Sequence, residues 1–211
     1  MSNFSASDLF QVALPVREAA DRDRSAIVEY LHQYLCTGVA PVAPRLEAAA
    51  RQIRDDNGRE PLGQAAWKWS ELTGKYYGCP FWSVAAFRLV SGLAERRPLD
   101  RLRAVCAAAS KKNREPDSIQ HEHVFRREHW RQMMAVFVRS AEPLSVADLV
   151  DLLDRYCVGC VVTRSEHERL GVQPSDRTNP WKRYSGTSIK LVDNPAWPQR
   201  HRAWIVEAGL L

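Results

Sequence analysis

Two short segments of the chain hold the residue types best suited to chemistry. The first contains His121, Glu122 and His123, and the second contains Glu166 and His167. Imidazole and carboxylate groups placed side by side can hold a divalent metal ion or move a proton. In a strand, residues i and i+2 point to the same face, so we expect His121 and His123 to project together and Glu122 to face the other way. The first segment can form such a site with His167 only if the chain folds back and brings His167 beside it.

Residues 119–171 resemble the ββα-metal core of HNH-type nucleases. Glu122-His123-Val124 matches the acidic-His-aliphatic end of that family's first strand, and His167 falls where the family has its last His or Asn. The resemblance implies that His123 is the general base, that Glu122 and His167 are ligands of a divalent metal (Mg, Mn or Zn), and that His121 assists. It also implies a metal-dependent nuclease that hydrolyses phosphodiester bonds in DNA or RNA, in the manner of a toxin or defence effector.

Basic residues near the two segments are candidates for phosphate binding. Arg126 and Arg127 follow the first segment directly, with Arg126 in place of the proline usual in the family, and Lys182 and Arg183 lie in a later loop-like stretch. Guanidinium and ammonium groups bind phosphate well. The formal net charge of +5 permits nucleic-acid binding without requiring it.

Two other interpretations fit the same residues. In the first, His121, His123 and His167 are structural, and the chain is a non-catalytic helical module that binds nucleic acid or protein. In the second, Cys157 and Cys160 join His121 and His123 in a four-ligand zinc site, because thiolate and imidazole are the ligands that zinc prefers. The apolar residues around both cysteines favour buried thiols instead.

Aromatic residues gather in two places. Those between 67 and 82 are interleaved with lysines, a pattern that suits either stacking on single-stranded nucleic acid or a core where three helices meet, and we favour the core. Around 179–186, Trp181, Arg183 and Tyr184 form either an exposed recognition surface or a seal over the core.

The spacing of apolar residues predicts a mainly helical protein with a small β element in its C-terminal half, an α+β class. We expect a helical region over 1–112 and an α+β region over 118–211, joined by the charged connector 111–118, or one continuous domain. Expected helices cover 17–35, 44–57, 62–73, 83–95, 99–112, 126–140, 145–156, 163–171 and 198–208. Expected strands cover 118–125, 157–163 and 189–192.

The bulk composition points to an ordinary globular protein. Apolar residues make up 45% of the 211 residues, and no apolar run is long enough to predict a membrane span. The N-terminus lacks the basic start of a secretory signal. An odd number of scattered cysteines, five, fits a reduced cytoplasmic protein. A protein partner or a second copy of the chain stays open.

Overall fold

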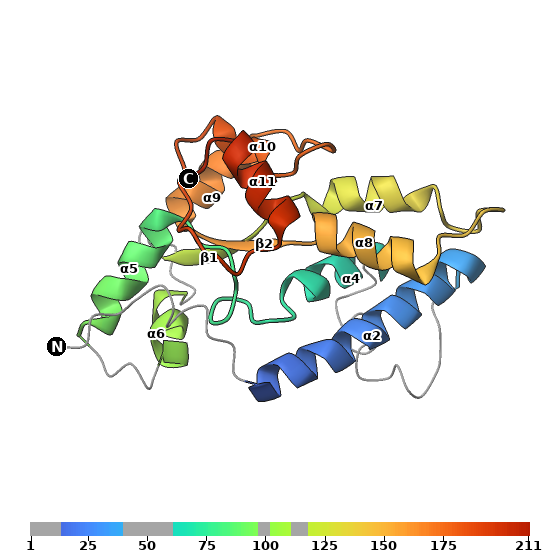
Figure 1. Cartoon of the computed structure of the whole chain (residues 1–211), viewed down its shortest axis with the longest axis horizontal. Helices are drawn as coiled ribbons and strands as arrows, with labels where there is room; N and C mark the ends of the chain where they lie inside the picture. The colour runs from blue at the N-terminus through green and yellow to red at the C-terminus, as the bar shows by residue number, and fades with distance from the viewer. Residues whose placement is uncertain (1–13, 40–60, 97–101, 111–117) are drawn as a thin grey trace. The chain divides into compact units, whose positions relative to one another are not determined.

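The computed structural model describes residues 14–39, 61–96, 102–110 and 118–211 (Figure 1). In these residues the chain is mostly helical, and its one sheet is a two-stranded antiparallel pair in the C-terminal half. The predicted α+β class is therefore confirmed. Within the described part of the chain, no helix is long and apolar enough to cross a lipid bilayer.

The described residues divide into two compact units, each built from segments that are distant in sequence. The described residues of Thr73–Val124 and Gly159–Leu211 form one, which we call the sheet unit. Those of Ala13–Leu72 and Phe125–Val158 form the other, which we call the helical unit. This division follows different lines from the expected regions 1–112 and 118–211, and the expected connector lies mostly at 111–117, outside the described residues.

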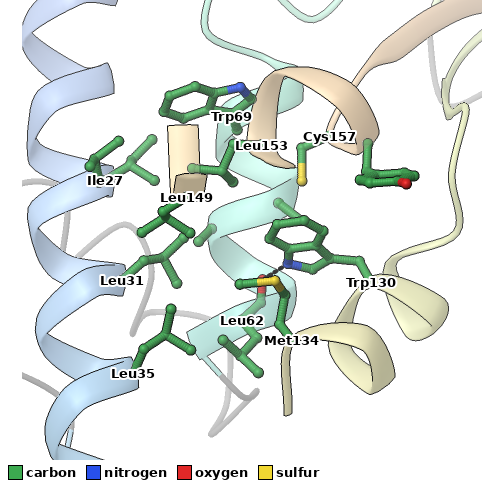
Figure 2. Packing of buried hydrophobic residues seen from close by; sticks show 14 of the residues in the cluster. Ile27, Leu31, Leu35, Leu62, Trp69, Trp130, Met134, Leu149, Leu153 and Cys157 are labelled. Carbon is green, nitrogen blue, oxygen red and sulfur yellow. Dashed lines mark hydrogen bonds between the residues drawn. The ribbon is translucent and has the colours of Figure 1, made fainter. Parts of the chain in front are cut away.

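Four helices of the described residues build the helical unit: α2 (Leu14–Thr37), α4 (Pro61–Ser70), α7 (Arg127–Ala135) and α8 (Val146–Tyr156). Helix α2 sends Ile27, Leu31 and Leu35 inward at a spacing of four residues, which places them on one helix face (Figure 2). Leu149 and Leu153 of α8 repeat that spacing and pack in the same cluster (Figure 2). The apolar pattern of each helix thus has a partner surface within the unit.

The sheet unit contains, among described residues, the elements α5 (Val84–Ala94), α6 (Leu102–Ala109), β1 (Ile119–His123), β2 (Gly159–Thr163), α9 (Arg164–Gly171), α10 (Lys182–Ser185) and α11 (Gln199–Glu207). Strands β1 and β2 pair antiparallel, with Ile119 opposite Thr163 and His123 opposite Gly159 (Figure 1). On the other side of β2, Trp82 forms a single parallel bridge with Val161. The chain before α5 is thereby fixed to the sheet.

Helix starts follow the capping residues in the sequence. Ser83 accepts a hydrogen bond from the backbone N–H of Ala86 at the start of α5, and Ser145 accepts one from Asp148 at the start of α8. Thr163 begins α9 with a complete capping box, as its spacing from Glu166 predicts. The helix expected over 44–57 lies outside the described residues. The strand expected over 189–192 is wrong in extent, since only a single bridge forms there, between Leu191 and Ser83.

The aromatic residues of both sequence clusters mostly fill cores. Trp69 is buried in the helical unit, and Phe81 and Trp82 are buried in the sheet unit. Trp181 and Tyr184 are both fully buried, and the Trp181 ring lies 5.0 Å from that of Phe81 between centroids. The interpretation of 181–184 as an exposed recognition surface is therefore corrected, because these rings close the core of the sheet unit.

Candidate functional site

The structure brings Glu122 and His167 together, as the sequence analysis required. Glu122 is on β1, and the Nδ1 atom of His167, on α9, is hydrogen-bonded to its Oε2 atom. The two residues are 45 positions apart in the sequence. The antiparallel pairing of β1 with β2 accounts for the approach, because α9 starts where β2 ends, beside the first residue of β1.

The local sequence fixes the position of the imidazole. Thr163 ends β2 and caps α9, and the Glu166 side chain accepts hydrogen bonds from the backbone N–H of Thr163 at 2.8 Å and from the hydroxyl of Ser83 at 2.6 Å. The first turn of α9 is thereby attached to β2 and to the start of α5. His167 is the next residue along this turn, so its backbone is held on a rigid support.

A buried arginine completes the group. The Arg183 Nη1 atom lies 2.6 Å from Oε1 of Glu122, and the two side chains are only 2% and 6% exposed. Each carboxylate oxygen of Glu122 therefore has its own nitrogen partner, Arg183 on Oε1 and His167 on Oε2. We call these three residues the Glu122 triad.

The surroundings favour the ionised carboxylate. Burial by itself raises the pKa of Glu122, but the hydrogen bond from His167 and the charge of Arg183 outweigh it and lower the pKa below the ordinary 4.5. An ionised carboxylate can only accept hydrogen bonds, so the proton between the two groups belongs to Nδ1 of His167. The Nε2 atom, on the other side of the ring, then carries the free electron pair whenever the imidazole is neutral.

The His167 ring can be reached from solvent while its partner cannot. Its side chain is 47% exposed, against 6% for Glu122. The hydrogen bond to Glu122 raises the pKa of His167 above the ordinary 6.5, against the opposing effects of partial burial and of the Arg183 charge. A half-exposed imidazole held by a buried carboxylate is an arrangement that can take up and release a proton near neutral pH.

His121 and His123 lie away from this pair. Strand alternation places their side chains on the face of β1 opposite to that of Glu122. Their rings meet edge to face, with centroids 5.5 Å apart. The structure therefore joins Glu122 to His167 and separates both from the side chain of His123, which the family resemblance implies as the base.

The four candidate phosphate-binding residues fall into different settings. Arg183 is buried, and its donors go to protein acceptors. Lys182 is partly exposed and its Nζ atom lies 2.9 Å from a carboxylate oxygen of Glu207. Arg126 and Arg127 belong to the helical unit, at the start of α7. Phosphate contacts by Lys182, Arg126 and Arg127 stay predictions, whereas Arg183 is placed inside the protein.

Within the Glu122 triad, Nε2 of His167 is the one donor atom that these contacts leave for a divalent metal ion. Both carboxylate oxygens of Glu122 already hold a nitrogen, and the same bond uses Nδ1 of His167. In the residues that the structure describes, no group of three or more His, Cys, Asp or Glu side chains could hold a metal. The predicted metal cofactor stays a prediction that these contacts do not support.

The proposed zinc set of two cysteines and two histidines is not assembled by the strand. Cys160 stands opposite Glu122 in the strand register, so its side chain shares the face of Glu122 and not that of His121 and His123. Cys157 belongs to the helical unit. Burial raises the pKa of both thiols well above its ordinary range, which favours the protonated, non-ligating form.

Sequence reasoning missed two polar partners of this region. Arg183 was expected at phosphate, yet it is the counter-ion of Glu122. Ser83 caps α5 and also donates to Glu166, a contact that the sequence did not predict. A usable signal exists for Arg183, since it is flanked by Trp181 and Tyr184 in a stretch with core-sized aromatics. No comparable signal marks Ser83.

We predict that the Glu122–His167 pair stabilises the fold most in a middle pH range. The lowered pKa of Glu122 gives stability that is present above pH 4.5 and lost as the pH falls through the folded-state value. The raised pKa of His167 gives stability that is present below pH 6.5 and lost as the pH rises through its folded-state value. Urea unfolding gives the free energy of unfolding of wild type and of His167→Phe at each pH. The difference between the two proteins should become smaller at low pH and at high pH. A difference that stays constant from acid to alkaline pH would contradict the pairing.

Comparison with family models, with curated proteins and with solved structures finds no match for this chain. The geometry of the Glu122 triad and the residues around it are therefore the features that point to a function.

Proposed function

We propose that the protein is a nuclease in which His167 transfers a proton during cleavage of a phosphodiester bond and Glu122 orients it. The observation that carries the proposal is the hydrogen bond between buried Glu122 and Nδ1 of half-exposed His167. The net charge of +5 and the resemblance of the segment to HNH-type nucleases support nucleic acid as the substrate.

The proton transfer follows from the tautomer. With Nδ1–H donated to Glu122, neutral His167 offers its Nε2 electron pair to the O–H of the attacking group. As that proton moves to Nε2, the oxygen forms a bond to phosphorus, the bond from phosphorus to the leaving oxygen breaks, and the leaving oxygen takes a proton from solvent water. The buried carboxylate stabilises the imidazolium that forms, as a nearby opposite charge does.

This chemistry suits RNA more directly than DNA. RNA carries its own nucleophile, the 2′-hydroxyl next to the scissile phosphate, so a single well-placed base can start the reaction. In this proposal the role of base moves from His123 to His167, because Glu122 meets the latter. A toxin or defence role, a cytoplasmic location and phosphate contacts by Lys182, Arg126 and Arg127 belong to the same proposal.

One observation favours the alternative, a non-catalytic binding module for nucleic acid or protein. The Glu122–Arg183 ion pair is almost fully buried and the arginine also bonds backbone carbonyls, which is an arrangement that holds elements together. In such a module the Glu122 triad would be structural, and His167 would take part in no reaction.

Cleavage assays on single-stranded RNA and on plasmid DNA separate the two functions. Each substrate is incubated with wild type, His167→Ala, His123→Ala and His32→Ala, in chelator and with Mg²⁺ or Mn²⁺. His32 lies on α2 in the helical unit and serves as the matched histidine control. We expect cleavage of RNA, a loss of about 100-fold or more for His167→Ala, and no loss for His32→Ala.

Three results would decide against parts of this proposal. Cleavage of neither substrate by wild type would reject the nuclease. Full activity of His167→Ala would reject the role of the imidazole. If cleavage requires Mg²⁺ or Mn²⁺ and is lost in His123→Ala but not in His167→Ala, the base is His123, as the HNH resemblance implies.

A further inference from the structure

Arg183 has an unusual position for an arginine. It lies on the four-residue helix α10, between two fully buried aromatic residues, and is itself 4% exposed. Arginine is almost never buried so completely unless its charge is paired. Its partners should therefore explain why a guanidinium is kept at this point of the sheet unit.

The guanidinium of Arg183 binds three separate groups at once. Its Nη1 atom donates to the carbonyl of His123 at 2.7 Å, at the end of β1. Its Nε and Nη2 atoms both donate to the carbonyl of Leu170, near the end of α9, at 3.2 and 2.9 Å. Nη1 also pairs with Oε1 of Glu122 at 2.6 Å. The rigid planar fork thus ties β1 to α9, the two elements that carry Glu122 and His167.

These contacts restrict the carboxylate of Glu122. When Oε1 is held by Arg183, rotation about the carboxyl bond is blocked, and Oε2 is left facing His167. Glu122 and Arg183 are both buried, and charge-assisted hydrogen bonds between buried groups are stronger than those at the surface. The fixed Oε2 then presents a single acceptor to the imidazole.

We propose that Arg183 is a positioning residue that acts through Glu122 and keeps neutral His167 in its Nδ1–H tautomer, with Nε2 presented to the substrate. The catalytic meaning of this inference rests on the proposed nuclease function, whereas the tautomer itself exists without catalysis. A free neutral histidine populates both tautomers, so a fixed tautomer is a property that the surroundings must impose.

The test measures the His167 tautomer by ¹⁵N NMR, at a pH where the ring is neutral. The variants are Arg183→Met, Arg183→Lys, Glu122→Gln and the double variant Arg183→Met/Glu122→Gln. Arg202→Met is the matched control, because it also removes one arginine of an ion pair in the sheet unit, the pair with Asp193 at the surface. Thermal unfolding establishes that each variant is folded.

We expect the Nδ1–H form to dominate in wild type and in Arg202→Met, and to decrease in the other variants. Since Arg183 acts through Glu122, the double variant should show no further decrease beyond Glu122→Gln. In the cleavage assay, Arg183→Lys should lower kcat by about 10- to 100-fold with little change in KM, as a displaced reactive group does.

The inference is overturned if folded Arg183→Met keeps the wild-type tautomer. It is also overturned if the decrease of the Nδ1–H form in the double variant equals the sum of the decreases in the two single variants. If Arg183→Met does not fold, Arg183→Lys decides, since lysine keeps the charge and lacks the fork, and an unchanged tautomer there has the same meaning. Failure of the nuclease is seen separately, as absence of cleavage by wild type with the tautomer still responding to Arg183.

Discussion

Replacing Trp130 by alanine is expected to lower the free energy of unfolding of the helical unit by about 3–5 kcal/mol, as removal of a large buried aromatic does. Trp130 is 1% exposed, and Met134 one turn later on α7 is fully buried in the same cluster (Figure 2). Its indole Nε1 donates to the carbonyl of Leu62 at 3.0 Å (Figure 2). Alanine would leave a cavity and remove this hydrogen bond between α7 and α4.

Two further variants separate the causes of that loss. Trp130→Phe keeps most of the apolar volume and loses the hydrogen bond, so we expect a smaller decrease, with about 1 kcal/mol from the bond itself. Val136→Ala, at the exposed end of the same helix, should change stability by about 0.5 kcal/mol or less. Urea unfolding followed by circular dichroism gives all three values. If Trp130→Ala loses less free energy of unfolding than Trp130→Phe, this core is not packed as described.

The helix pattern around Trp130 illustrates what the sequence can predict. Most expected helices that fall on described residues are present, because periodic apolar residues and capping residues act over a few positions. Ser83, Ser145 and Thr163 each cap the helix that follows, as their spacing indicates. The weak point is 189–192, where β-type residues form one bridge, since strand formation needs a partner that local sequence does not specify.

The division into units could not be predicted for a related reason. Helix and strand signals are local, whereas the helical unit joins α2 and α4 to α7 and α8 across more than fifty residues. Which apolar faces pack together depends on shape and on chain connection. A change of composition near 111–118 therefore predicted a boundary in sequence, while the contacts follow packing.

The sequence predicted the approach of Glu122 and His167 in the candidate site, but not the third partner, Arg183. Alternation along β1 separated Glu122 from its neighbouring histidines, and the capping box placed His167 at the start of a helix, so their approach was a geometric expectation that the structure meets. The partner of the other carboxylate oxygen was not predicted, because Arg183 is 61 residues further along the chain. Its neighbours Trp181 and Tyr184 indicate a buried stretch, but local sequence does not specify which carboxylate pairs with the arginine.

Glu122→Gln is expected to destabilise the sheet unit by about 3–5 kcal/mol, because it removes one partner of a buried ion pair and leaves the other charge in place. The amide keeps the shape of the carboxylate, so packing changes little. Arg183, with a side chain 2% exposed, would lose its counter-ion without gaining water. The amide NH₂ would also face a donor, either Arg183 or Nδ1 of His167, and one hydrogen bond would be lost.

Asp193→Asn provides the matched comparison for this loss. Asp193 and Arg202 also form an arginine–carboxylate pair at 2.6 Å, in the same unit, but their side chains are 53% and 40% exposed. Water replaces the lost partner there, so the same chemical change should cost a small fraction of the Glu122→Gln effect, and less still at high salt. Both variants are compared with wild type by urea unfolding near pH 6. Equal losses at the two pairs would mean that burial of Glu122 and Arg183 is not what makes their pairing strong, and the Glu122 triad would then have no special rigidity to offer His167.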